Sequence, residues 1–305
     1  MGEIAKFSNQ LRSSISDPVA PEGSFYDQVV RLLDRIEYRR ADSAAEREAL
    51  FRLRYQAYMR DGTIAPNAEG MFSDPYGDRG NVYLFGLYLD GILASSLRLH
   101  IGSAVNPDFP SREVFPDFLQ PEIDAGKVIV DPTRFVVDDG LARLHRALPY
   151  ATLRLCGMAA VYFGADHLLA AVRVEHQAFY RRVFRHQLVC EARAYPQLSK
   201  PIRLMTINYP TVAEDAYQRY PFFRTTASEQ TILSSAACRA RCAAGDPGHH
   251  QASIRHRPRP PGGARRHDDP HRQLGPALAL VFFRAGMRLT FRLRAGAWRA
   301  AAVNE

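Results

Sequence analysis

A carboxylate and a guanidinium lie three residues apart in the stretch from Lys127 to Asp138, the part of the sequence best suited to chemistry. β-Branched residues on both sides of Asp131 and Arg134 predict a buried strand, which Pro132 must interrupt because a proline removes a ladder hydrogen bond. On an ideal strand Asp131 and Arg134 face opposite sides, but a bulge would turn one of them toward a shared cleft. The alternative is a strand that carries a surface ion pair.

Two further arginines, Arg54 and Arg98, fall in expected elements of their own, and Asp74 lies in a loop rich in Pro, Gly, Asn and Asp. Together with Arg134 they exceed what a site for a neutral substrate needs. One arginine could hold a substrate carboxylate as a bidentate fork, while another pairs with Asp74 to hold the loop. The alternative is that all three form structural ion pairs only.

Charge is distributed unevenly along the 305 residues, which carry a net charge of +8. Residues 238–305 hold 13 arginines, no lysine and four acids, whereas the first 237 residues hold 27 basic and 28 acidic residues. We therefore expect no nucleic-acid partner for the folded part. No run of 18 uncharged apolar residues is present, so we expect no transmembrane segment.

Composition divides the chain into three parts. Residues 1–22 predict a mobile lead-in, and residues 23–235 predict one folded domain. Much of residues 236–305 cannot bury a core, and arginine without lysine is typical of a GC-rich gene read out of frame. Our interpretation is a natural C-terminus replaced near Ser234. The alternative is a basic tail in which residues 278–298 make weak contact with an anionic membrane surface.

The four cysteines are too few and too irregularly spaced for a disulfide framework, and the sequence shows no signal peptide. A cytoplasmic location is therefore expected. Cys238 and Cys242, followed by His249 and His250, fit the spacing of zinc ligands poorly, so we expect no metal.

Hydrophobic periodicity and turn residues predict alternating helices and strands. Asp90-Gly91 predicts a hairpin between strands at 81–89 and 92–101, and the apolar run 166–172 predicts a strand buried on both faces. Further strands are expected at 37–41, 127–138, 187–194 and 202–209, and helices at 25–36, 43–60, 112–119, 148–163, 175–184, 212–220 and 227–233. This order predicts an α/β (α+β) fold, a mixed central sheet with helices on both faces.

The order of elements, with a splayed central strand before a long helix, resembles the GNAT acyltransferase fold. In that superfamily a glycine-rich loop after the splayed strand holds the pyrophosphate of coenzyme A on backbone N–H groups. Here the loop reads Asp138-Asp139-Gly140, and two carboxylates with one glycine make a poor pyrophosphate cradle. The donor implied is one without a pyrophosphate, such as the acyl-phosphopantetheine of an acyl carrier protein.

Four short motifs resemble those of the acyl-homoserine-lactone (autoinducer) synthases and, more closely, the N-acyl amino acid synthases. They occur in the same order and carry Arg54 and Tyr58, then Asp74, then Arg98, then Asp131 with Arg134 and Phe135. The resemblance covers about residues 25–235. It departs from the family pattern at Gly77, where a second acid is usual, and at Asp131, where autoinducer synthases have the longer glutamate.

The resemblance implies an enzyme that moves a fatty acyl chain from acyl carrier protein to the α-amine of an amino acid, with no bound cofactor. Asp131, as a base acting through a water, and Arg134 are the expected catalytic residues, because the ammonium must lose a proton and an oxyanion must be stabilised. The expected substrate-binding residues are Arg54, Tyr58, Asp74, Arg98 and Phe135. The alternatives are a coenzyme A-dependent acetyltransferase and a non-enzymatic acyl-binding module on the same fold.

Overall fold

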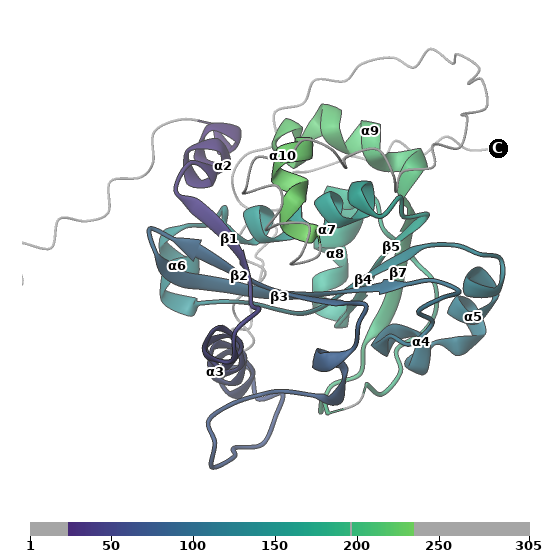
Figure 1. Cartoon of the computed structure of the whole chain (residues 1–305), viewed down its shortest axis with the longest axis horizontal. Coiled ribbons are helices and arrows are strands. Elements are labelled where there is room, and N and C mark those ends of the chain that lie inside the picture. The colour runs from purple at the N-terminus through teal and green to yellow at the C-terminus, as the bar shows by residue number, and fades with distance from the viewer. Residues whose placement is uncertain (1–23, 196, 235–305) are drawn as a thin grey trace, which may run out of the picture.

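The centre of the protein is a seven-stranded sheet in the order β1-β2-β3-β4-β5-β7-β6 (Figure 1). The structure is a computed structural model, and it describes residues 24–195 and 197–234. All neighbouring strands pair antiparallel except β4 and β5, which are parallel, so the expected mixed sheet is confirmed. The strands are β1 (Ile36–Arg40), β2 (Val82–Leu89), β3 (Ile92–Gly102), β4 (Ile129–Val137), β5 (His167–Val172), β6 (Gln187–Leu188) and β7 (Arg203–Asn208).

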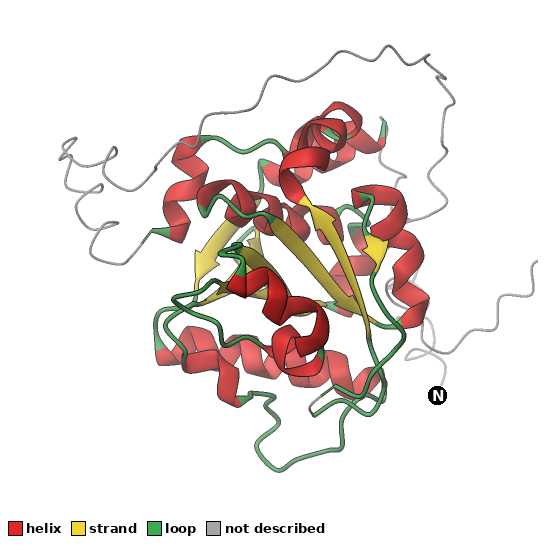
Figure 2. Ribbon diagram, turned by 90° about the vertical axis from the view of Figure 1, so that its right-hand side faces the viewer, coloured by secondary structure: helices red, strands yellow, loops and turns green. Residues whose placement is uncertain are grey.

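Helices cover both faces of this sheet, as the sequence predicts (Figures 1 and 2). One face carries α3 (Ala44–Arg60), α4 (Pro110–Val114) and α5 (Pro116–Asp124). The other carries α2 (Phe25–Leu33), α7 (Leu148–Tyr162) and α10 (Ala227–Gln230). Residues of α8 (Gln177–Phe184) and α9 (Tyr209–Arg219) pack in the same core cluster as α7, and α6 (Asp139–Leu144) precedes α7.

The start of α3 is fixed by a capping box. The Ser43 side chain accepts a hydrogen bond from the Glu46 N–H, and the Glu46 carboxylate accepts one from the Ser43 N–H. The helix buries Leu50, Leu53 and Ala57. Since residues four apart share one face of a helix, this start also fixes where Arg54 and its neighbour Tyr58 stand relative to the sheet.

The hairpin between β2 and β3 turns at Asp90 and Gly91, which have φ of +49° and +81°. Positive φ at both positions matches the twist of two antiparallel strands, so the predicted hairpin is confirmed. The register that follows makes alternate residues of β3 face opposite sides. Ser95 contacts Thr152 of α7, whereas Ser96 contacts Arg54 of α3.

Strands β4 and β5 separate soon after they meet. They pair only at Ile129 with His167 and at Val130 with Leu168, after which β5 stays with β7 while β4 stays with β3. The expected splayed strand is therefore present, and it opens on the β5 side alone. Two neighbouring strands in the middle of the sheet thus leave a gap between them that backbone hydrogen bonds do not close.

A bulge in β4 aims Arg134. Thr133 pairs with Arg98 and Val136 with Ser96, so Arg134 and its successor stand opposite a single β3 residue. Arg134 has φ +55°, a left-handed conformation that costs free energy in a residue with a side chain. A bulge is present, but it lies two residues after Pro132. The expectation that Pro132 interrupts the strand is wrong, because Pro132 lies within β4 and pairs with Leu99.

Four local predictions differ from the structure. The helix expected at 112–119 is two helices, α4 and α5. The strand expected at 187–194 keeps only Gln187–Leu188 and an isolated bridge from Arg193 to Ile202. Helix α6 was not expected; the Asp138 side chain begins it by accepting a hydrogen bond from the Leu141 N–H. The segment 63–80, expected as a loop, contains a short 3-10 helix at Pro75–Asp78.

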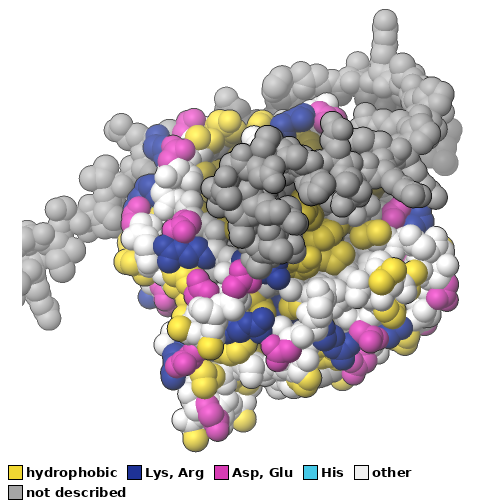
Figure 3. Space-filling model, in the orientation of Figure 1, with side chains coloured by type: hydrophobic (Ala, Val, Ile, Leu, Met, Phe, Trp, Pro, Cys, Tyr) yellow, Lys and Arg dark blue, Asp and Glu magenta, His cyan; other side chains and the backbone are white. Residues whose placement is uncertain are grey.

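The predictions for residues 1–22 and 236–305, including the four candidate zinc ligands and the membrane contact of the tail, lie outside the described residues. Within the described ranges, no helix is long and apolar enough to cross a membrane. Acidic and basic side chains are interspersed on the face in Figure 3. This agrees with the near-neutral balance of the first 237 residues.

Candidate active site

The carboxylate of Asp74 is shared by two arginines from neighbouring strands. Arg98 of β3 donates from Nη1 to Oδ1, and Arg134 of β4 donates from Nε to Oδ2 at 2.8 Å. All three side chains are at most 3% exposed. Asp74 also accepts from the Tyr76 N–H at the start of the 3-10 helix, so the cluster ties the loop to the sheet. Arg98 in turn donates from Nε to the Thr133 hydroxyl at 3.0 Å.

Electrostatics keep the Asp74 carboxylate ionised. Burial by itself raises the pKa of Asp74, but the hydrogen bonds and charges of Arg98 and Arg134 outweigh it and hold the pKa well below its usual range. Such charge-assisted hydrogen bonds stabilise the protein only while both partners are present. Removing one partner leaves the other as a buried unpaired charge, which destabilises the fold.

Arg54 adds a third guanidinium without a second carboxylate. It is 1% exposed and donates to the Ser96 hydroxyl at 3.1 Å, but its Nη2 has no partner among the described residues. Burial and the nearby charge of Arg98 lower the pKa of Arg54 to about 9.

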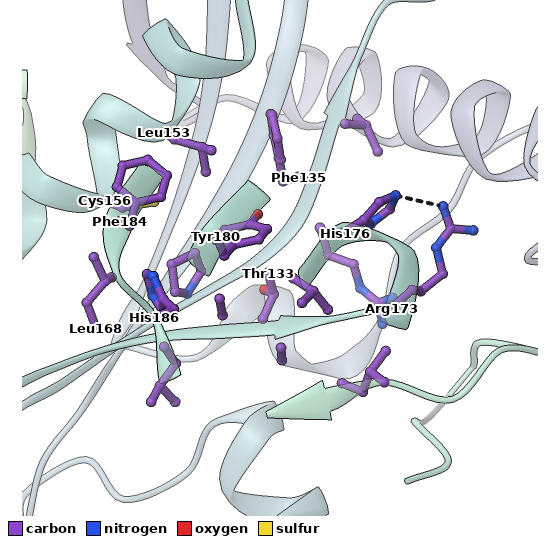
Figure 4. Close-up of a pocket in the computed structure, with 18 of the residues that line it drawn as sticks. Thr133, Phe135, Leu153, Cys156, Leu168, Arg173, His176, Tyr180, Phe184 and His186 are labelled. Atoms are coloured by element: carbon purple, nitrogen blue, oxygen red, sulfur yellow. Dashed lines mark hydrogen bonds between the residues drawn. The ribbon is translucent and has the colours of Figure 1, made fainter. Parts of the chain in front are cut away.

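The gap between β4 and β5 holds a cavity of about 210 Å³ (Figure 4). Toward α7, α8 and α9 its walls are largely apolar; toward α3 they include Tyr58, Asp61 and Thr63. Three of the predicted site residues line it, namely Tyr58, Arg134 and Phe135. Arg54, Asp74, Arg98 and Asp131 do not; the first three stand behind Arg134 as the charge cluster just described.

Arg134 is held from several sides. Its guanidinium lies 4.8 Å from the Phe72 ring centroid and 5.7 Å from that of Tyr195. Only Nε is hydrogen-bonded, and no residue in the described ranges accepts a bond from either Nη. Arg134 thus lines the cavity with both terminal nitrogens unbonded within the described ranges.

Asp131 lies apart from Arg134. Its carboxylate accepts from the Ser111 N–H at 3.1 Å and from the Ser111 hydroxyl at 2.7 Å, at the start of α4. The expectation that both residues face one cleft is therefore wrong: Arg134 lines the cavity and Asp131 does not. The bulge turns the side chain of Arg134 toward the cavity. Asp131 lies before the bulge, so its side chain follows the regular alternation of the strand and points toward α4. Complete burial raises the pKa of Asp131 to about 6, against the opposing effects of Ser111 and Arg98.

The comparison with family models decides the assignment. The model of the N-acyl amino acid synthase FeeM matches residues 49–208, slightly more than half of the chain. The chain belongs to the FeeM family of N-acyl amino acid synthases. As a family member it is an N-acyltransferase with a GNAT-like fold. All four motifs lie within the matched residues.

Several solved structures are similar. FeeM from uncultured soil microbes is 17% identical, with 58% of this chain and 92% of that chain covered and a TM-score of 0.48. The AHL synthase LasI is 16% identical, with 56% and 88% covered and a TM-score of 0.42. An acyl-CoA N-acyltransferase from Pseudomonas aeruginosa is 21% identical, with 56% and 97% covered and a TM-score of 0.39. Among curated proteins, none matches the chain.

Tyr195 is a polar residue of the cavity that the sequence did not mark. Tyr195 is 6% exposed, lines the cavity, and has a hydroxyl with no hydrogen-bond partner among the described residues. Burial and the negative charge of Asp131 raise its pKa, so the phenol stays neutral and can donate. No local pattern marks it, because only the tertiary fold brings the segment after β6 beside β4. In the described part of the chain, no group of three metal-ligating side chains lies together.

Proposed function

We propose that the protein transfers a fatty acyl chain from acyl carrier protein to the α-amine of an amino acid. The observation that carries this proposal is the cavity in the β4–β5 gap, apolar toward α7 and bounded by Arg134 on the α3 side. One end suits a hydrocarbon chain and the other an anion, which is the polarity that such a pair of substrates needs.

The acyl chain is assigned to the part of the cavity beside Leu153, Leu168 and Phe184. Burial of each methylene there contributes about 0.8 kcal/mol to binding. The acceptor carboxylate is assigned to the Nη atoms of Arg134, which offer a planar pair of donors. The Asp74 carboxylate supports this role because it fixes Nε and leaves the other two nitrogens toward the cavity.

In the reaction, the amine nitrogen forms a bond to the thioester carbon and the carbon–sulfur bond breaks. One proton of the ammonium passes to Asp131, and a second ends on the departing thiolate. Since Asp131 does not line the cavity, a water must carry its proton. A pKa near 6 suits a base that works near neutral pH. The unpartnered Tyr195 hydroxyl is assigned to the developing oxyanion.

Replacing Asp131 by Asn tests the base. We expect kcat to fall roughly 10²- to 10⁴-fold, the usual contribution of a positioned base. The free energy of unfolding, in contrast, should rise in this variant above about pH 4. The pKa of Asp131 is higher in the folded protein than in the unfolded one, so the free energy of unfolding of the wild type falls as the pH rises from about 4 to about 6. An asparagine does not titrate. The variant should therefore become more stable than the wild type by about 3 kcal/mol over this pH range. Urea unfolding at pH 4 and pH 8, with steady-state kinetics, measures both; a wild-type kcat would end this assignment.

The donor is inferred from the start of α6. There the Asp138 carboxylate occupies the helix N-terminus and accepts from the Leu141 N–H, at the place where a coenzyme A pyrophosphate would need free N–H groups. Two negative groups at one helix start repel each other. A phosphopantetheine arm without pyrophosphate avoids that repulsion, which favours acyl carrier protein over coenzyme A.

We therefore expect acyl carrier protein thioesters to give a kcat/KM at least about tenfold above that of the same acyl group on coenzyme A. Asp138→Ser keeps a side chain that can cap the helix but removes the negative charge that repels a pyrophosphate. It should therefore reduce the difference in kcat/KM between the two donors. Equal kcat/KM for the two donors in the wild type would refute the choice of donor and favour the coenzyme A-dependent alternative.

The reaction itself is tested with the full chain, acyl carrier proteins loaded with several chain lengths, and a mixture of amino acids. Mass spectrometry should detect an N-acyl amino acid and free carrier thiol in equal amounts. Acyl binding without any amide product would instead support the non-enzymatic acyl-binding module.

A further inference from the structure

A histidine interrupts the apolar part of the cavity. His186 is 2% exposed and lines the cavity beyond the end of α8. Its ring contacts those of Tyr180 and Phe184, at centroid distances of 5.6 and 6.0 Å. Figure 4 places it on the side of Leu168, away from Arg173 and His176. Leu168 is the last β5 residue paired with β4, so His186 stands near the closed end of the gap.

Neither ring nitrogen of His186 has a described partner in good hydrogen-bond geometry, although backbone carbonyls of Leu168, Leu169 and Tyr180 lie near the ring. Burial lowers its pKa to about 3, although nearby backbone carbonyls such as that of Leu168 favour the protonated ring. The imidazole is therefore neutral, with one nitrogen that donates and one that accepts. A buried donor and acceptor without partners destabilise the protein, and a ligand that supplies a partner recovers this free energy on binding.

We propose that His186 recognises an oxygen atom on the acyl chain, a hydroxyl or keto group, and so selects oxygen-substituted chains over saturated ones. The proposal rests on the proposed function in placing the acyl chain in this cavity. A neutral imidazole can donate to a keto oxygen, and can donate to or accept from a hydroxyl. A saturated chain would fill the same space without offering His186 a hydrogen-bond partner.

The position of the oxygen follows from the gap. The reacting carbonyl belongs beside Arg134, where β4 and β5 are apart, whereas His186 stands near the paired end. The recognised oxygen therefore lies along the chain and away from the thioester carbon.

The test is equilibrium binding of acyl-pantetheine amides, which cannot transfer their acyl group. Chains of one length are compared, saturated or with a hydroxyl or keto group at successive carbons. We expect the wild type to bind one position about tenfold more tightly than the saturated chain. His186→Leu should lose this preference and bind the saturated chain at least as well as the wild type. His186→Phe, which keeps a ring, provides a second variant if the first fails to fold.

The matched control is Phe184→Leu, which alters the same wall without removing a polar group. It should weaken binding of all chains alike and keep the preference for oxygen. Equal affinity for all chains in the wild type, a preference that survives in both His186 variants, or no binding of any chain would overturn the proposal. A preference in binding without product formation with any amino acid would retain it while refuting the proposed function.

Discussion

Replacement of Asp74 by Asn is expected to lower the free energy of unfolding by about 3–5 kcal/mol, the cost of removing one partner from a buried ion pair. The cost is large because Asp74 compensates both Arg98 and Arg134, each at most 3% exposed. An asparagine keeps the size and one acceptor but leaves the guanidiniums without a counter-charge. Urea unfolding monitored by circular dichroism at pH 7 gives the difference.

The matched control for Asp74 is Asp78→Asn in the same loop. Asp78 is 87% exposed and pairs with Arg47, so its loss should change the unfolding free energy by less than about 0.5 kcal/mol. Acid provides a second check on Asp74. Its folded pKa is depressed, so its stabilising effect is complete above the unfolded pKa near 3.9 and is lost only as the pH falls below it. Equal costs for the two variants would contradict the central role of Asp74.

Arg134→Lys is expected to lower kcat/KM for the amino acid roughly 10²-fold. A lysine ammonium cannot bond Asp74 through one nitrogen and present a planar pair to a carboxylate at the same time. Arginine and lysine at position 134 have the same left-handed backbone conformation, with φ +55°. Backbone strain therefore does not account for a difference between the wild type and the variant. Most of the loss should fall on KM, because the carboxylate is bound before and during the reaction.

The carboxylate role of Arg134 can be separated from a general loss of structure. An amino acid amide lacks the carboxylate, so it should be a poor acceptor for the wild type and an equally poor one for the variant. Arg193→Lys is the control, since Arg193 forms a bidentate pair with Asp117 on the surface. Its kinetics should match those of the wild type. An unchanged kcat/KM in Arg134→Lys would exclude binding of the amino acid carboxylate by Arg134.

Local features of this protein were predictable from its sequence. Ser43 with Glu46 marks the start of α3, and Asp90-Gly91 marks the hairpin, because the physical cause of each lies within a few residues. The stretch around Asp131 and Arg134 was also singled out correctly as a strand with a bulge. A bulge moves one side chain relative to its neighbours, and the sequence does not say which one.

Features that depend on distant partners were not predictable. Asp131 points at Ser111, twenty residues earlier, and this contact removes it from the cavity. Tyr195 and His186 carry no local signal, because their importance comes from walls supplied by β4, β5 and α8. The short β6 shows the same limitation: residues 187–194 fit a strand, but β7 pairs only with Gln187 and Leu188 of β6.

The shared carboxylate of Asp74 also has a consequence for how the protein folds. Asp74 belongs to an irregular segment, yet its partners come from β3 and β4 in the middle of the sheet. If Asp74 moved away, the buried guanidiniums of Arg98 and Arg134 would repel each other without a counter-charge. The segment around Asp74 should therefore open only when the sheet itself opens. Residues near Asp74 should therefore show amide exchange as slow as that of the central strands, although they lie outside any strand. The irregular segment is thus a cooperative part of the folding unit, and it should keep Arg134, which lines the cavity, in one position between turnovers.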